Sequence, residues 1–153
     1  MDIEKKYELI PSDKEGLYRI KTLKDFNNVK KGDIGGYIQT ENNLSQLGDC
    51  WIYDDAKVYG NAAIKGDAKV HDAVDYIVFK NFWSSGRYFT WTRSDNKWSV
   101  GCFYGTGEEL IKKAYADSEK SGREYERVVR YVESILADER KYRNIIINTN
   151  NHP

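Results

Sequence analysis

Histidine is the residue best suited to acid–base chemistry in this chain, which contains only two. His71 directly follows Val70, an apolar position of the repeat described below. We therefore expect its imidazole to lie on an outer surface, where it could act as a general base. Because no orienting partner is recognisable in the sequence, a solvated surface residue is the alternative interpretation. For His152, next to the C-terminus, we expect disorder.

Other candidate groups have simpler explanations. The carboxylate pair Asp54–Asp55 is typical of a turn, and Glu108–Glu109 is typical of the start of a helix. Gly105–Gly107 is too short for a phosphate-binding loop and lacks the required lysine. Cys50 and Cys102 have no metal or redox spacing, so we expect two buried free thiols. We expect no metal and no cofactor.

Aromatic and basic side chains alternate between residues 76 and 104, where Asp95 is the one acid. Aromatic rings stack on unpaired bases and cations neutralise phosphates, so such a surface can hold single-stranded nucleic acid. Protein-binding hot spots have a similar composition. Alternatively, one aromatic face with Phe79, Trp91 and Trp98 packs beneath two helices. The candidate binding residues are Phe82, Trp83, Arg87, Tyr88, Arg93 and Lys97.

A six-residue repeat runs from Ile34 to Val74 and must position His71. One position of the repeat is held by Ile34, Ile52, Val58, Ile64 and Val70, with Thr40 and Gln46 as polar exceptions. A second position, four residues later, is held by Ile38, Leu44, Cys50, Ala56, Ala62, Ala68 and Val74. We expect both sets to point inward. Hexads suit a parallel β-helix with three flat sides per coil and Gly, Asn or Asp at the corners.

This stretch resembles the hexapeptide-repeat left-handed β-helix family, most clearly in 56–61, 62–67 and 68–73. Residues 17–28 and 32–38 are similar to the lead-in of short hexapeptide-repeat proteins of phages and bacteria. The resemblance covers roughly residues 17–75, about half the chain. Large members of the family are acyltransferases, in which a histidine on a coil wall is the general base, and others are scaffolds. The hexads here make little more than two coils, fewer than the enzymes have.

The flanking segments have different periods. We expect residues 1–33 to form short strands that cap the first coil. After Val74 the apolar period becomes two, which predicts a three-stranded antiparallel meander ending near Cys102. Thr106–Glu109 has the pattern of a capping box, so a helix should begin there and be interrupted at Ser121–Gly122. A second amphipathic helix should end in a basic turn at Arg140–Arg143.

The predicted fold class is mainly β plus α+β: about two coils of left-handed parallel β-helix, then a three-stranded meander packed on two helices. The predicted regions are capping strands at 1–33, the β-helix at 34–75, an α+β interaction unit at 76–143 and a tail at 144–153. The tail contains Ile145–Ile147. That apolar run could add an edge strand, contact a partner chain or dock on the meander.

Basic and acidic residues number 24 each, so no bulk charge attracts the molecule to nucleic acid or to an anionic membrane. No stretch approaches the ~20 apolar residues of a membrane span, and the first residues do not have the pattern of a signal peptide. We therefore expect a cytoplasmic protein, in the host cell if a phage encodes it.

Three functions remain open. We favour a non-enzymatic interaction protein, a phage or mobile-element accessory that inhibits a host defence machine such as a CRISPR nuclease. Its partner would be a host protein or ribonucleoprotein complex. The second hypothesis is an acyltransferase-like protein that uses His71 in a homo-oligomer, and the third is a single-stranded nucleic-acid binder.

Overall fold

The computed structural model describes the backbone of residues 4–150 and the side chains of residues 4–143. The chain divides into two compact units, Met1–Thr106 and Gly107–Pro153. In the part of the chain that is described, no helix is both long and apolar enough to cross a bilayer.

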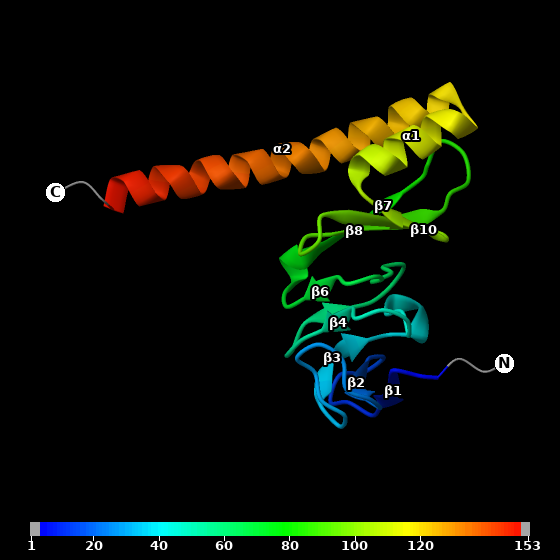
Figure 1. Ribbon diagram of the computed structural model, residues 1–153, viewed down its shortest axis with the longest axis vertical. Coiled ribbons are helices and arrows are strands. Elements are labelled where there is room, and N and C mark those ends of the chain that lie inside the picture. Colours follow the sequence, from blue (N-terminus) through cyan, green and yellow to red (C-terminus); the bar gives the residue numbers. More distant parts are fainter. Residues whose placement is uncertain (1–3, 151–153) are drawn as a thin grey trace. The chain divides into compact units, whose positions relative to one another are not determined.

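The N-terminal segment of the first unit forms a sheet that continues into the repeat (Figure 1). Strands β1 (Tyr7–Ile10), β2 (Tyr18–Thr22) and β3 (Ile34–Ile38) are antiparallel neighbours. On its other side, β3 pairs in parallel with β5 (Lys57–Val58). The N-terminal strands therefore extend one side of the repeat.

The repeat itself is joined by parallel contacts. Besides the β3–β5 pair, Leu44 pairs with Ile64, and β4 (Trp51–Ile52) pairs with β6 (Lys69–Val70). The paired residues are 18 or 20 positions apart, which is about three hexads. Such pairing is what stacked three-sided coils require. The mixed β and α+β class is confirmed, whereas the left-handed β-helix stays a prediction.

Most of the two apolar sets point inward as predicted. Their fully or almost fully buried members are Ile38, Leu44, Cys50, Ile52, Ala56, Val58, Ala62, Ile64, Ala68 and Val70. Ile34 and Val74 depart from the prediction, with 55% and 61% of their surface exposed. Both lie at the ends of the repeat, where the stack does not continue, and Val74 lies in a 3₁₀ turn, Ala73–Asp75, that leads the chain out of the coil.

The two polar exceptions have structural roles. Thr40 caps a 3₁₀ turn, Glu41–Asn43 (η1), at a corner of the coil. The side-chain oxygen of Gln46 accepts hydrogen bonds from the backbone N–H groups of Lys6 (2.8 Å) and Tyr7 (3.1 Å). The Gln46 side chain therefore provides an acceptor for two backbone N–H groups at the start of β1, which an apolar residue at this position could not do.

A fully buried lysine, Lys6, also attaches the N-terminal segment to the coil. Its ammonium group donates to the carbonyl oxygens of Gly48 (3.1 Å) and Cys50 (2.6 Å) and to the Cys50 sulfur (3.4 Å). Burial lowers the pKa of the Lys6 amine and raises the pKa of the Cys50 thiol. Three acceptors for three N–H donors compensate for the desolvation of this group.

The second half of the first unit is an antiparallel sheet of four strands, not the expected three. Its order is β10 (Phe103–Gly105), β9 (Lys97–Val100), β8 (Tyr88–Thr92), β7 (Tyr76–Lys80). Because Gly101 adopts a positive φ of 55°, the chain turns there, and Phe103–Gly105 folds back on β9. Cys102 lies in this turn and is exposed, so the prediction of a buried thiol is right for Cys50 and wrong for Cys102.

Both faces of this sheet are largely covered. Phe89, Trp91 and Trp98 are buried on one face. On the other face, Thr90 and Ser99 are buried, and the Thr90 hydroxyl accepts from the backbone N–H of Ala63 at 3.0 Å. The second face therefore packs on the coil and covers its end.

The second unit is a pair of packed helices, α1 (Gly107–Asp117) and α2 (Glu119–Asn150). α1 begins directly after Thr106, as the capping-box pattern predicts. The break between the helices lies at Ser118 and not at Ser121–Gly122. The hydroxyl of Ser118 accepts from the backbone N–H of Ser121 at 3.1 Å, which caps α2.

Gly122 lies inside α2 and has a packing role. A Cβ atom there would overlap the ring of Tyr115, so the absence of a side chain lets the helices approach closely. Arg130 of α2 donates to Glu108 of α1 at 2.6 Å, and this hydrogen bond lowers the pKa of Glu108. The backbone of α2 continues through Asn150, beyond the last turn expected at Arg140–Arg143. The side chains of Ile145–Ile147 lie outside the described residues.

Candidate functional site

His71 lies just after β6 on the outside of the coil, and its side chain is exposed, as its place after the inward-pointing Val70 predicts. Its backbone N–H donates to the Asp75 carboxylate at 2.8 Å. The same carboxylate oxygen accepts from the backbone of Asp72 at 3.1 Å. These two bonds fix the backbone from which the imidazole projects.

The imidazole of His71 stacks on the ring of Tyr53, with centroids 4.2 Å apart and planes inclined by 13°. The stack follows from the parallel register, because Ile52 pairs with Val70 and the next residues of each chain segment are therefore neighbours. The Tyr53 hydroxyl donates to the side-chain oxygen of Asn28 at 3.1 Å. Burial raises the pKa of this hydroxyl, which favours the neutral form that can donate.

Tyr53 was missed in the sequence, although a signal for it exists. It precedes His71 by 18 residues, the length of three hexads. In a three-sided coil, residues at this spacing lie above one another on the same wall. The sequence analysis recognised no orienting partner for His71, whereas the structure supplies an aromatic one.

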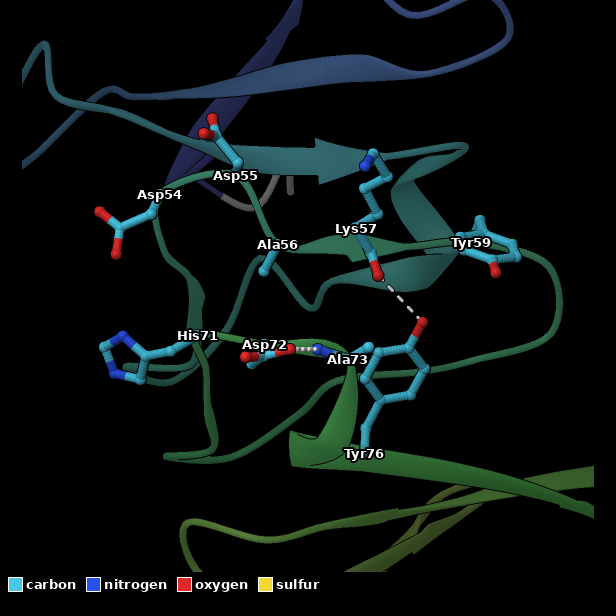
Figure 2. A pocket seen from close by; sticks show the side chains of 9 residues that line it. All are labelled: Asp54, Asp55, Ala56, Lys57, Tyr59, His71, Asp72, Ala73 and Tyr76. Carbon is cyan, nitrogen blue, oxygen red and sulfur yellow. Dashed lines mark hydrogen bonds between the residues drawn. The ribbon is translucent and has the colours of Figure 1, made fainter.

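His71 borders a shallow concavity of about 460 Å³ (Figure 2). Figure 2 shows His71 at one side and Tyr59 and Tyr76 at the opposite side, and the Tyr76 hydroxyl donates to the Lys57 carbonyl at 2.9 Å. The other lining residues are Asp54, Asp55, Ala56, Asp72 and Ala73. The concavity therefore presents three carboxylates and one ammonium group beside an imidazole.

The turn that carries Asp54 and Asp55 is held in place by β2. The guanidinium of Arg19 donates to the Asp54 carbonyl (2.6 Å) and to the Asp55 carboxylate (3.2 Å). It also lies 4.4 Å from the centroid of the Tyr37 ring, in cation–π geometry. One wall of the concavity is thus braced from outside the repeat.

In the described part of the chain, the imidazole nitrogens of His71 have no hydrogen-bond partner in the protein. The stack on Tyr53 is the contact that orients the ring, and the residue is exposed at the edge of the concavity. An accessible, oriented imidazole can take a proton from an attacking hydroxyl or amine. Among residues 4–143, no group of three or more histidine, cysteine or acidic side chains could hold a metal ion.

The structure separates the six predicted binding residues into two groups. Phe82, Trp83, Arg87 and Tyr88 lie where β7 turns into β8. At the other end of β8, Arg93 follows its last residue and Lys97, the first residue of β9, pairs with that last residue. The four-residue step along β8 is about 13 Å. The Arg93 guanidinium lies over Trp91 and donates to the Val74 carbonyl, and Lys97 lies over the Tyr104 ring. A binding role for either group stays a prediction.

Comparison with known proteins adds one finding. No family model matches the chain. The chain is similar to a protein of Escherichia coli (strain K12) named "Uncharacterized acetyltransferase YdcK", with 44% identity over 55 residues. The matched region is 35% of this chain but only 17% of the relative, so the chain corresponds to a small part of that protein. The similarity fits a hexapeptide-repeat protein; a phage origin is not shown.

This finding contradicts the favoured function. The expectation of a non-enzymatic inhibitor of host defence is wrong on this comparison, since the relative is named an acetyltransferase. The comparison favours the second hypothesis, an acyltransferase-like protein with His71. The sequence analysis did not favour that hypothesis, because the repeat is short and no orienting partner of His71 is recognisable in the sequence. In the structure, the turn at Asp54–Asp55 supplies a wall and Tyr53 supplies orientation.

Proposed function

We propose that this chain transfers an acetyl group from a thioester such as acetyl-coenzyme A to a hydroxyl or amine acceptor, with His71 as the general base. The observation that carries this proposal is the exposed, stacked imidazole at the edge of the concavity. The acetyltransferase name of the relative supports it, although the match covers only 17% of that protein.

The chemistry requires one proton acceptor. A nitrogen of His71 takes the proton of the acceptor O–H or N–H as that atom attacks the thioester carbonyl and forms the new bond to carbon. The tetrahedral intermediate then collapses, the carbon–sulfur bond breaks, and the thiolate leaves. The imidazolium returns the proton to sulfur, so the products are the acetylated acceptor and a free thiol, with His71 regenerated.

The charges of the site limit how a donor could bind. Asp54, Asp55 and Asp72 would repel the phosphates of coenzyme A. We therefore expect the thioester end of the donor to reach His71 while its nucleotide binds outside the concavity.

The repeat around His71 would have its own fold, location and state of association. The proposal includes a left-handed hexapeptide-repeat β-helix of the bacterial or phage type. The hexads and the spacing of the parallel pairs support its stacked coils. A cytoplasmic location would give access to acetyl-coenzyme A. Self-association would add coil walls to the short repeat, and mass photometry of the isolated chain would measure it.

The proposal is tested by mixing the chain with acetyl-coenzyme A and a panel of hydroxyl and amine acceptors. Release of the free thiol is followed by a colorimetric thiol reagent, and acetylated product by mass spectrometry. Enzyme-dependent release with at least one acceptor supports the proposal. No release, together with no calorimetric binding of acetyl-coenzyme A, would overturn it.

The stack on Tyr53 gives a separate prediction. Tyr53→Leu removes the aromatic surface that orients the imidazole, so kcat should fall by roughly 10- to 100-fold with little change in KM. Tyr53→Phe keeps the ring and loses only the hydrogen bond to Asn28, so it should stay close to the wild type. Steady-state kinetics of both variants checks this, and equal kcat values for Leu and Phe would show that stacking does not position the base.

A further inference from the structure

The loop between β7 and β8 gathers aromatic and basic side chains at one end of the four-stranded sheet. Lys80 pairs with Tyr88 as the last residues of the ladder, and the backbone N–H of Asn81 donates to the Arg87 carbonyl at 2.8 Å. We call the set the loop cluster: Lys65, Lys80, Phe82, Trp83, Arg87 and Tyr88. It lies away from Arg93 and Lys97, which sequence reasoning had grouped with it.

Two aromatic members of the loop cluster, Phe82 and Tyr88, are exposed and do not belong to the core. Phe82 has 75% of its surface exposed and Tyr88 has 41%. Phe82 contacts the half-buried Trp83 edge to face, with centroids 5.4 Å apart. Trp83 in turn lies 6.4 Å from the buried Phe89. The inner ring is therefore anchored to the core, while Phe82 and Tyr88 remain exposed to solvent.

Three cations surround these rings. The Lys80 ammonium lies 5.8 Å from the centroid of Tyr88. Lys65 donates to the carbonyl of Gly101, and the Arg87 guanidinium lies against the same glycine. Within the described residues, none of the three cations has an ion pair. The sequence from Tyr76 to Ser94, which carries Lys80 and Arg87, contains no acidic residue that could neutralise these two cations.

We propose that the loop cluster binds single-stranded nucleic acid. Exposed rings provide stacking surfaces for unpaired bases, and the unpaired cations are complementary to a chain of phosphates. A duplex hides its base faces, so it could use only the cations. This site is distinct from the His71 concavity, and the proposal goes beyond acetyl transfer.

The test is fluorescence anisotropy of the full chain with labelled oligothymidine and oligouridine, at several salt concentrations. Phe82→Ala should weaken binding by roughly 5- to 150-fold, the range that corresponds to loss of one stacked base. Arg87→Ala should reduce the magnitude of the slope of log K against log salt by about 0.7, as expected for one lost phosphate contact. Circular dichroism verifies that both variants are folded.

Lys97→Ala is the matched control, because Lys97 lies on the same sheet at the far end of β8. This variant should bind like the wild type. Three results would each overturn the proposal: no salt-dependent binding of either oligonucleotide, an equal loss in Lys97→Ala, or equal affinity for a duplex of the same length. The last result would mean that charge alone is responsible and that stacking contributes nothing.

Discussion

Replacing His71 by asparagine is expected to lower kcat for acetyl transfer by about 10²- to 10⁴-fold, the usual contribution of a general base. Asparagine is polar and close in size but cannot accept the proton released by the acceptor at neutral pH. Binding of the acetyl donor should change little, because the walls of the concavity come from other residues. The measurement is the initial rate of thiol release, with donor affinity determined by calorimetry.

His152→Asn is the control for this experiment, since the chain has only two histidines. It should retain the wild-type rate. A His71→Asn variant that keeps the wild-type kcat would remove His71 from the mechanism, even if the chain proved to be a transferase. If both variants lost activity to the same extent, the loss would not be specific to His71 and would not support its role as the base.

Replacing Gly36 by alanine is expected to destabilise the first unit by about 3 kcal/mol, the upper end of the usual cost of overpacking. An ideal Cβ at Gly36 would lie 2.5 Å from the carbonyl oxygen of Ala56 and 2.6 Å from a methyl carbon of Ile52. That carbonyl accepts the backbone N–H of Tyr37 at 2.9 Å, a bond between successive turns of the repeat. Relief of the overlap would therefore separate paired backbone segments.

An opposing effect is smaller. Alanine restricts the unfolded chain more than glycine does, which stabilises a protein by roughly 0.4–1 kcal/mol where the native site tolerates it. Urea unfolding followed by tryptophan fluorescence reports this unit, because Trp51, Trp83, Trp91 and Trp98 all belong to it. A Gly36→Ala variant as stable as the wild type would contradict the close approach of the two segments.

Gly60→Ala is the matched control for Gly36. Gly60 also lies in the repeat, but no atom is within 4 Å of its ideal Cβ, and its φ is 65°. The expected cost is only that of a left-handed residue with a side chain, about 1 kcal/mol. If Gly60→Ala lowered the free energy of unfolding more than Gly36→Ala, the expected order would be reversed. Backbone conformation, and not close packing, would then be the larger constraint on these glycines.

The repeat could be predicted from sequence because burial has a strict period there. Each apolar hexad position faces the same interior, so Ile52, Val58, Ile64 and Val70 are marked by their spacing alone. One polar exception in the repeat could not be explained from the sequence, because its partners are distant in the chain. Gln46 is polar because β1, some 40 residues earlier in the chain, offers it backbone partners.

The second sheet shows a different limit. Alternation of apolar residues predicted strands correctly up to Val100, but a reversal at Gly101 leaves the alternation nearly unchanged, so the fourth strand was not recognised. Ser118 presents the same problem, since Ser121–Gly122 is the more obvious helix breaker in the sequence. A serine hydroxyl that caps a helix outweighed the low helix propensity of glycine.

The candidate site was predicted only in part. The exposure of His71 follows from Val70, but its stacking partner and the concavity depend on which turns the parallel register brings together. The aromatic and basic residues were recognised as a group by composition, which cannot distinguish the two ends of a strand. Only the ladder register separates Arg87 from Arg93.

The claim that an acetyl thioester reacts at His71 is tested most directly by histidine-selective NMR of the full chain during titration with acetyl-coenzyme A. The two histidines give two sets of ring signals, which a His152→Asn variant assigns. We predict that the His71 signals shift in a saturable manner while those of His152 stay in place, and that Tyr53→Leu alters the His71 signals before any donor is added. If the His71 signals do not shift at any donor concentration, the account is contradicted.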